Sequence, residues 1–265
     1  MSITTKLVRI TQLLSRNRHL TALLRWLVSK PQMAPLFLMI YGLWKRLESA
    51  PLGHLLSEIR PDQWIIDCGA HFGYYTKHFN QVVAGSGKVL AIEPNPSSVS
   101  LLKRRQRREG WSRIAVSPSA VWSSETSLAL ARDGPFDVAS RVSASSAPGD
   151  VKVSATTIDR LVATLGIRSL YMIKVDVEGA ELEVLKGARA TLEKLSPLVV
   201  CEIGNDYRKD VENYCAELFE FLSGVNYTCR MTDSPSELWT VSELVRRIVN
   251  ERYVDVLLVP RSSKK

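Results

Sequence analysis

The stretch that decides the fold is Trp64-Ile65-Ile66-Asp67-Cys68-Gly69-Ala70-His71-Phe72-Gly73. An apolar run ends at an acid, and two glycines four positions apart follow it, which is typical of a buried strand that turns into a helix beside a nucleotide. Gly69 lets the chain turn sharply off the strand, and Gly73 lets the next helix approach without a clash from a Cβ atom. The sequence therefore predicts a nucleotide-binding strand and its turn.

A second apolar run, Lys88-Val89-Leu90-Ala91-Ile92, ends at Glu93, which lies 26 residues after Asp67. An acid at this spacing stands where the ribose of an adenosine needs a hydroxyl acceptor. Alternatively, Glu93 caps the helix that follows Pro94, because acids stabilise helix N-termini. The two strand ends predict a cofactor crevice. Its candidate residues are Asp67, Gly69, Ala70, His71, Gly73 and Glu93.

The loop between the two glycines bears on which cofactor is expected. A dinucleotide site requires G-x-G-x-x-G, so that backbone amides meet a pyrophosphate, but His71 stands at the middle glycine and no third glycine follows. The loop suits a ligand without phosphates, such as S-adenosylmethionine, better than a nicotinamide dinucleotide. For His71 itself, a hydrogen-bonded loop position and a catalytic role both stay open.

From residue 60 onward, strand-like apolar runs alternate with helix-like segments, a pattern typical of parallel sheets covered by helices on both faces. The predicted strands are 64–68, 88–92, 113–117, 170–175, 198–202, 226–231 and 254–259. The predicted helices are 73–83, 96–109, 157–165, 180–195, 211–222 and 236–249, and the stretch 139–149 is expected to be a loop that acts as a mobile lid. The count predicts a Rossmann-like α/β fold, a seven-stranded sheet with an antiparallel last strand.

Three charged residues follow one another at alternate positions where the strand at 170–175 ends: Lys174, Asp176 and Glu178. A period of two places them on one side. A lysine in a central parallel strand is costly to bury unless it is paired, and the two acids are its nearest partners. The group is either a self-contained ion network or a functional site, and the position favours a site because open α/β sheets bind ligands at the carboxyl ends of their strands.

The chain resembles the FkbM-type methyltransferases, a branch of the S-adenosylmethionine-dependent class I enzymes, over about residues 60 to 260. The matching stretches are Ile66 to Thr76, Ile92 to Pro96, Thr157 to Leu161, Ile173 to Glu181, Leu185 to Ala188 and Leu198 to Ile203. The block Lys-x-Asp-x-Glu-Gly-x-Glu at 174–181 is the specific part, whereas the glycine loop alone is typical of the whole superfamily. His71 departs from the Asn that is common at its position in such proteins.

The resemblance implies a class I methyltransferase fold, with Asp67, Gly69, Gly73 and Glu93 holding the cofactor. It also implies O-methylation of hydroxyls on sugars, glycolipids or polyketide-like products. A sugar hydroxyl is a poor nucleophile and needs a base or a metal to remove its proton. The candidate catalytic residues are Asp176 and Glu178, then Glu202 at the end of the neighbouring strand, with Lys174 holding their geometry. Two close carboxylates would also suit a divalent ion, although no metal is predicted.

Residues 1–55 form a separate, basic N-terminal extension of the catalytic domain predicted at 56–265. The first 47 residues contain eight Lys or Arg and no acid, which leaves 27 basic and 27 acidic residues in the rest of the chain. Apolar residues at helical spacing predict basic amphipathic helices at about 3–28 and a second apolar helix at 36–47. The extension is interpreted either as a cap on the substrate cleft or as an anchor on anionic lipid.

The neutral body argues against a nucleic-acid groove in the catalytic domain. An RNA methyltransferase that uses the basic extension as an arm is therefore kept only as an alternative function. A non-catalytic membrane-associated binding module is another. No apolar run reaches the roughly 18 residues that a membrane span needs. The four cysteines, Cys68, Cys201, Cys215 and Cys229, show no metal or disulfide spacing and predict buried free thiols. A cytoplasmic protein, resting on the inner membrane surface, is expected, with mitochondrial import as the alternative.

Overall fold

The computed structural model describes residues 52–131, 141–145, 147–205, 208, 210–232, 237–251 and 253–261. The helices predicted at 3–28 and 36–47, and with them the cap and anchor interpretations, lie outside the described residues. The part of the extension that is described forms a short helix, α4 (Leu52–Leu56), which the sequence analysis did not predict. Its Leu52 is buried against the main sheet.

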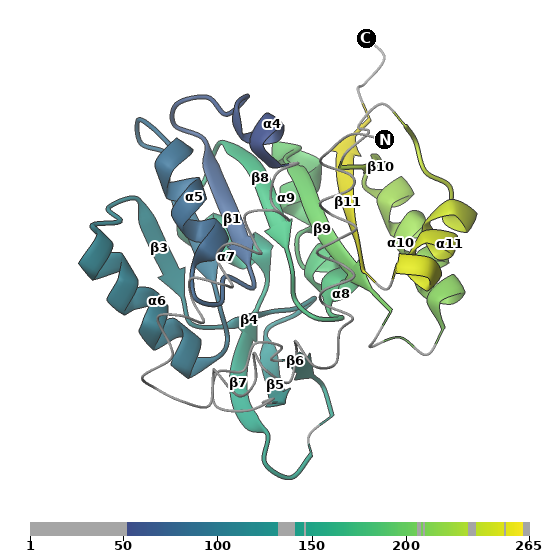
Figure 1. The fold of residues 1–265 in the computed structure, drawn as a ribbon, viewed down its shortest axis with the longest axis horizontal. Coiled ribbons are helices and arrows are strands. Elements are labelled where there is room, and N and C mark those ends of the chain that lie inside the picture. Colours follow the sequence, from purple (N-terminus) through teal and green to yellow (C-terminus); the bar gives the residue numbers. More distant parts are fainter. Residues whose placement is uncertain are drawn as a thin grey trace.

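The main sheet has seven strands in the order β10-β11-β9-β8-β1-β2-β3 (Figure 1). The strands are β1 (Trp64–Cys68), β2 (Val89–Ile92), β3 (Ile114–Ser117), β8 (Leu170–Val175), β9 (Leu198–Gly204), β10 (Tyr227–Met231) and β11 (Tyr253–Pro260). β11 runs antiparallel to both of its neighbours, whereas β3, β2, β1, β8 and β9 are parallel. The predicted seven-stranded α/β sheet with an antiparallel last strand is confirmed.

Helices cover both faces of the sheet because its central strands bury side chains in both directions. Ile65 and Met172 pack on one face with α4, α5 (Tyr74–Val82) and α6 (Pro96–Glu109). Ile66 and Ile173 pack on the opposite face. The helices on that face are α7 (Ile158–Thr164), α8 (Glu181–Lys186), α9 (Arg189–Leu195), α10 (Val211–Gly224) and α11 (Val241–Glu251). This two-sided burial explains why the central strands read as continuous apolar runs.

A second sheet of four strands, in the order β4-β7-β5-β6, is inserted between β3 and β8 (Figure 1). Its strands are β4 (Ala120–Val121), β5 (Thr126–Ala131), β6 (Arg141–Ser143) and β7 (Val151–Thr156). Leu128, Leu130 and Val153 form its small core. The prediction of a loop over 139–149 is therefore wrong for residues 141–143, because they pair antiparallel with β5.

The single helix predicted over 180–195 is wrong, because two helices, α8 and α9, meet there at Gly187. A Cβ atom on Gly187 would lie 2.1 Å from the backbone oxygen of Trp122, which follows β4. The carboxylate of Asp159 accepts hydrogen bonds from the first amides of α9, on Ala190 and Thr191, at 3.0 and 2.7 Å. The break between α8 and α9 thus lets the backbone that follows β4 of the second sheet approach the helices that cover the main sheet.

Candidate cofactor and acceptor site

The predicted site residues gather at the carboxyl edge of the main sheet. Asp67 lies in β1 and directly opposite Lys174 in β8. Glu93 follows β2 by one residue, and Glu202 lies near the end of β9. Because the carboxyl ends of parallel strands meet at one edge, residues far apart in the sequence become neighbours here.

The glycine loop after β1 contacts the segment after β8 through its backbone. Gly69 has a φ of 80°, and a Cβ atom on it would lie 1.8 Å from the carbonyl oxygen of Asp176. The amide of Asp176 in turn donates to the carbonyl of Cys68 at 3.1 Å. The sharp turn predicted at Gly69 is confirmed, whereas a Cβ on Gly73 would lie 2.5 Å from the side chain of Leu102, which belongs to α6 and not to the helix that follows Gly73. The glycine loop and the predicted catalytic segment are therefore in direct contact.

Asp67 is a buried carboxylate, and only one of its two oxygens has a hydrogen-bond partner among the described residues. Its side chain is fully enclosed, and its Oδ2 accepts a hydrogen bond from Thr76 Oγ1 at 2.6 Å. Its Oδ1 has no hydrogen-bond partner among the described residues. Burial raises the pKa of Asp67, and the charge of Lys174 opposes that rise. A buried acceptor without a donor fits a ligand that brings a donor or a positive charge.

Glu93 binds the loop rather than capping a helix. Its two carboxylate oxygens accept hydrogen bonds from the amides of His71 and Asn95, both at 2.8 Å. The alternative in which Glu93 caps the following helix is wrong, because the side chain of Asn95 caps α6 by accepting from the amide of Ser97. His71 has a φ of 49°, and its backbone is thus a structural part of the loop. Ala70 donates its amide to the carbonyl of Ile92.

Burial raises the pKa of Glu93 from 4.5 to about 7, although the two amides that it binds lower it. The folded protein therefore holds a proton here that the unfolded chain has released between pH 4.5 and about 7. The stabilisation is complete below pH 4.5 and is lost as the pH rises through about 7.

We expect the unfolding free energy of the wild type to fall over this range by about 3 kcal/mol more than that of Glu93→Gln, which has no such proton. Urea unfolding of both proteins from about pH 4 to about pH 8 measures the difference, in which buried acids that do not interact with Glu93 cancel. Parallel curves for the two proteins would contradict the assignment.

Lys174 is buried and paired, as the sequence analysis predicted. Its Nζ lies 2.9 Å from Asp176 Oδ2 and 4.3 Å from the centre of the Tyr75 ring. The strand ends at Val175 as predicted, but the period of two does not extend to Glu178, because Glu178 lies in a turn with a φ of 53°. Lys174 and Asp176 therefore form one unit, and Glu178 belongs to the turn that leads into α8.

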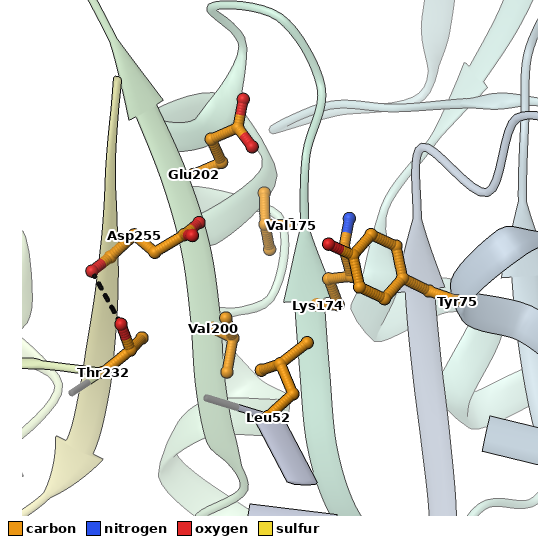
Figure 2. Close-up of a pocket in the computed structure, with 8 residues that line it drawn as sticks. All are labelled: Leu52, Tyr75, Lys174, Val175, Val200, Glu202, Thr232 and Asp255. Carbon is orange, nitrogen blue, oxygen red and sulfur yellow. Dashed lines mark hydrogen bonds between the residues drawn. The ribbon is translucent and has the colours of Figure 1, made fainter. Parts of the chain in front are cut away.

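A pocket lies beside this pair, and Figure 2 shows side chains from several elements around it. Lys174 comes from β8, Glu202 from β9 and Asp255 from β11, and Glu202 and Asp255 are opposite each other in the two strands. Leu52 of α4, Tyr75 of α5, Val175, Val200 and Thr232 complete the lining. Asp255 was not among the predicted site residues, although an acid between Val254 and Val256 in the last strand was a signal for it.

A buried ion pair, also missed, anchors the turn that contains Glu178. Glu181, at the start of α8, pairs with Arg208 in the segment between β9 and α10, and their side chains are 2% and 5% exposed. Glu181 Oε1 accepts a hydrogen bond from the amide of Gly179 at 2.7 Å, and the Arg208 guanidinium lies 3.9 Å from the centre of the Tyr214 ring. The partners are 27 residues apart, and no local pattern links them.

The described residues include acids, histidines, several helices and all four cysteines. No group of three or more His, Cys, Asp or Glu in this part of the chain could hold a metal ion. Within the same residues, every helix is too short or too polar to cross a bilayer. All four cysteines are buried free thiols, as predicted.

Comparison with known proteins supports the resemblance found in the sequence. The sequence profile of the methyltransferase FkbM domain matches residues 67–229. The hexuronic acid methyltransferase AglP of Haloferax volcanii is 28% identical over 150 residues, which are 55% of this chain and 58% of that protein. The chain thus matches only part of the length of this relative.

Solved structures are similar in the same region. An FkbM methyltransferase from Methylobacillus flagellatus aligns with a TM-score of 0.49 and 19% identity, over 84% of this chain and 54% of that one. A SAM-dependent methyltransferase from Aquifex aeolicus aligns with a TM-score of 0.42 and 12% identity, over 79% and 89%. The FkbM profile covers more than half of the chain and includes both strand ends of the crevice, and the protein therefore belongs to the FkbM methyltransferase family.

Proposed function

We propose that this protein is an S-adenosylmethionine-dependent O-methyltransferase that acts on a hydroxyl of a sugar, a glycolipid or a related natural product. One observation carries the choice of cofactor. Asp67 and Glu93 are both buried at neighbouring strand ends, and the charge of Asp67 contributes to the raised pKa of Glu93. A positively charged ligand relieves this repulsion, whereas the pyrophosphate of a dinucleotide adds to it.

The residues of the crevice fit such a cofactor. When bound, S-adenosylmethionine supplies a methyl group on a positively charged sulfur, which is the electrophile of the reaction. Asp67 Oδ1, which is buried without a donor among the described residues, would accept from the amino group of the ligand. Glu93 would accept from the ribose hydroxyls with the lone pairs that the His71 and Asn95 amides leave available. Gly69 and Gly73 shape the loop between these two acids.

The acceptor side would be formed by Lys174, Asp176 and Glu202. A carboxylate there would take the proton of the acceptor hydroxyl as its oxygen accepts the methyl group, whose bond to the sulfur of the donor breaks at the same time. Asp176 is fixed for this role by Lys174, which holds its Oδ2 at 2.9 Å, while Glu202 lines the adjacent pocket. Glu178 remains a candidate from the turn. A divalent ion is not part of this proposal.

The proposed class of acceptor rests on AglP, whose name states its substrate. AglP acts on a hexuronic acid, and its similarity supports a sugar acceptor for this chain. A hydroxyl of a sugar also matches the need for a proton-accepting carboxylate at the pocket.

Calorimetric titration tests the cofactor. We expect S-adenosylmethionine to bind the wild type in the micromolar range and Glu93→Ala about tenfold or more weakly, equivalent to about 1.4 kcal/mol. NADH should not bind either protein. Glu220→Ala, which removes an exposed acid from α10 on the other side of the sheet, is the matched control and should bind normally. Equal affinities in the wild type and Glu93→Ala, or binding of NADH instead, would refute the proposal.

A further inference from the structure

Helix α6 concentrates positive charge in a region of the chain that is neutral overall. It contains Lys103 and four arginines in 14 residues, with Glu109 as its single acid. Residues 48–265 have equal numbers of basic and acidic side chains. Figure 1 shows α6 at the outer margin of the molecule, beside the edge strand β3. A local excess of positive charge on an outer helix creates an electrostatic potential that attracts an anionic partner.

The positive charges of α6 divide into an inner and an outer group. Arg105 is half-buried, where it donates to the carbonyl of Phe72, pairs with Glu109 and lies 5.1 Å from the centre of the Trp111 ring. Glu109 is also paired with Lys77 at 3.0 Å, and these two cations lower its pKa to about 2. The negative charge of Glu109 is therefore largely neutralised by Arg105 and by Lys77 of α5.

The outer group consists of four exposed residues, Lys103, Arg104, Arg107 and Arg108. Their spacing of one, three and one positions places them on one side of the helix, opposite the buried Val99 and Leu102. No ion pair within the described residues involves Lys103, Arg104 or Arg107, and Arg108 contacts Glu109 at 3.3 Å while its side chain stays 68% exposed. We call these four residues the α6 basic face.

The stability of the helix does not explain the α6 basic face. Lys103 with Arg107, and Arg104 with Arg108, are like charges at i and i+4, which destabilise a helix. The helix dipole favours cations only in the last turn, which holds Arg107 and Arg108 but not the other two. Lys103 and Arg104 therefore add repulsion to the helix without a favourable interaction with its dipole. Binding to an anionic surface would remove that repulsion.

We infer that the α6 basic face binds an anionic phospholipid bilayer by charge alone. The face has no exposed large apolar side chain to insert. A bilayer presents anionic charge over a plane, and each nearby Lys or Arg adds to the attraction. The first 47 residues of the chain supply eight further cations and no acid, with apolar residues at helical spacing. A contact of these residues with lipid would reinforce the contact of the α6 basic face, since peripheral anchoring usually needs two weak signals.

Sedimentation of the full chain with vesicles tests the inference. The probes are vesicles of phosphatidylcholine with phosphatidylglycerol and vesicles of phosphatidylcholine alone, at low and high salt. We expect binding to the anionic vesicles only, weakened about tenfold or more in K103Q/R104Q/R107Q/R108Q, and a difference that shrinks as salt rises. Glutamine is a good helix former, so the helix should be retained, and thermal unfolding checks this.

The matched control is K152Q/R168Q/K194Q/R246Q, which removes the same charge from four exposed positions on other elements. It should bind anionic vesicles like the wild type. The inference is overturned if the control loses as much affinity as the α6 variant, if the α6 variant binds like the wild type, or if the wild type binds neither kind of vesicle. Preference of the wild type for duplex RNA over vesicles at equal phosphate would overturn it as well.

Discussion

Gly69→Ala is expected to lose detectable binding of S-adenosylmethionine and to unfold at lower urea concentration. The new Cβ would lie 1.8 Å from the carbonyl oxygen of Asp176, where backbone faces backbone and no flexible side chain can move aside. The φ of 80° adds a cost of roughly 1–2 kcal/mol for any residue with a Cβ. Either the glycine loop or the segment after β8 must shift, and both carry site residues. Calorimetry and urea unfolding of the variant measure the two effects.

The variant Gly110→Ala measures the cost of a positive φ at a position where the new Cβ causes no steric clash. Gly110 ends α6 with a φ of 67°, and a Cβ on it would meet nothing within 4 Å. This control should lose about 1 kcal/mol of stability and keep its full affinity for the cofactor. If Gly69→Ala bound the cofactor as well as Gly110→Ala does, the contact between the two segments would not matter for the site.

Arg208→Met should lower the free energy of unfolding by about 3–5 kcal/mol, because it leaves the carboxylate of Glu181 buried without its counter-ion. Removing both charges should be far milder. The double variant Glu181→Leu with Arg208→Met is expected to recover most of the loss, since two apolar side chains can fill the place of a buried pair. Urea unfolding of the three proteins gives the coupling between the two residues.

An exposed pair provides the comparison. Arg160 and Glu125 lie 3.7 Å apart with side chains 65% and 61% exposed. Arg160→Met should change the stability by no more than about 1 kcal/mol. A loss in Arg208→Met as small as this would show that the Glu181–Arg208 pair does not hold the turn of Glu178 and Gly179.

The parts of the site that sequence reasoning could predict depend on local rules. A strand of apolar residues that ends in an acid and a glycine has few alternatives, and Asp67, Gly69 and Glu93 are indeed brought to one edge of the sheet. The pairing of Lys174 with Asp176 followed from the cost of burying a lysine.

The parts that were missed depend on contacts between distant segments. β6 has only three residues and forms because β5 offers it an edge. The break at Gly187 exists because the backbone of Trp122 lies against it. Asp255 enters the pocket only through the pairing of β11 with β9, and Arg208 finds Glu181 only after both elements have packed. Apart from the acid at Asp255 in an otherwise apolar strand, none of these contacts leaves a period or a motif in the sequence.

The insertion of the second sheet between β3 and β8 has a consequence for how the chain folds. Asp67 and Lys174 are opposite each other in adjacent strands, yet about a hundred residues separate them along the chain. The chain must close this long loop before β1 and β8 can pair, which makes their pairing slow compared with the local hairpins and helices. We therefore expect Asp67 and Lys174 to come together late in folding. The cofactor should then bind only a chain in which β1 and β8 have already paired.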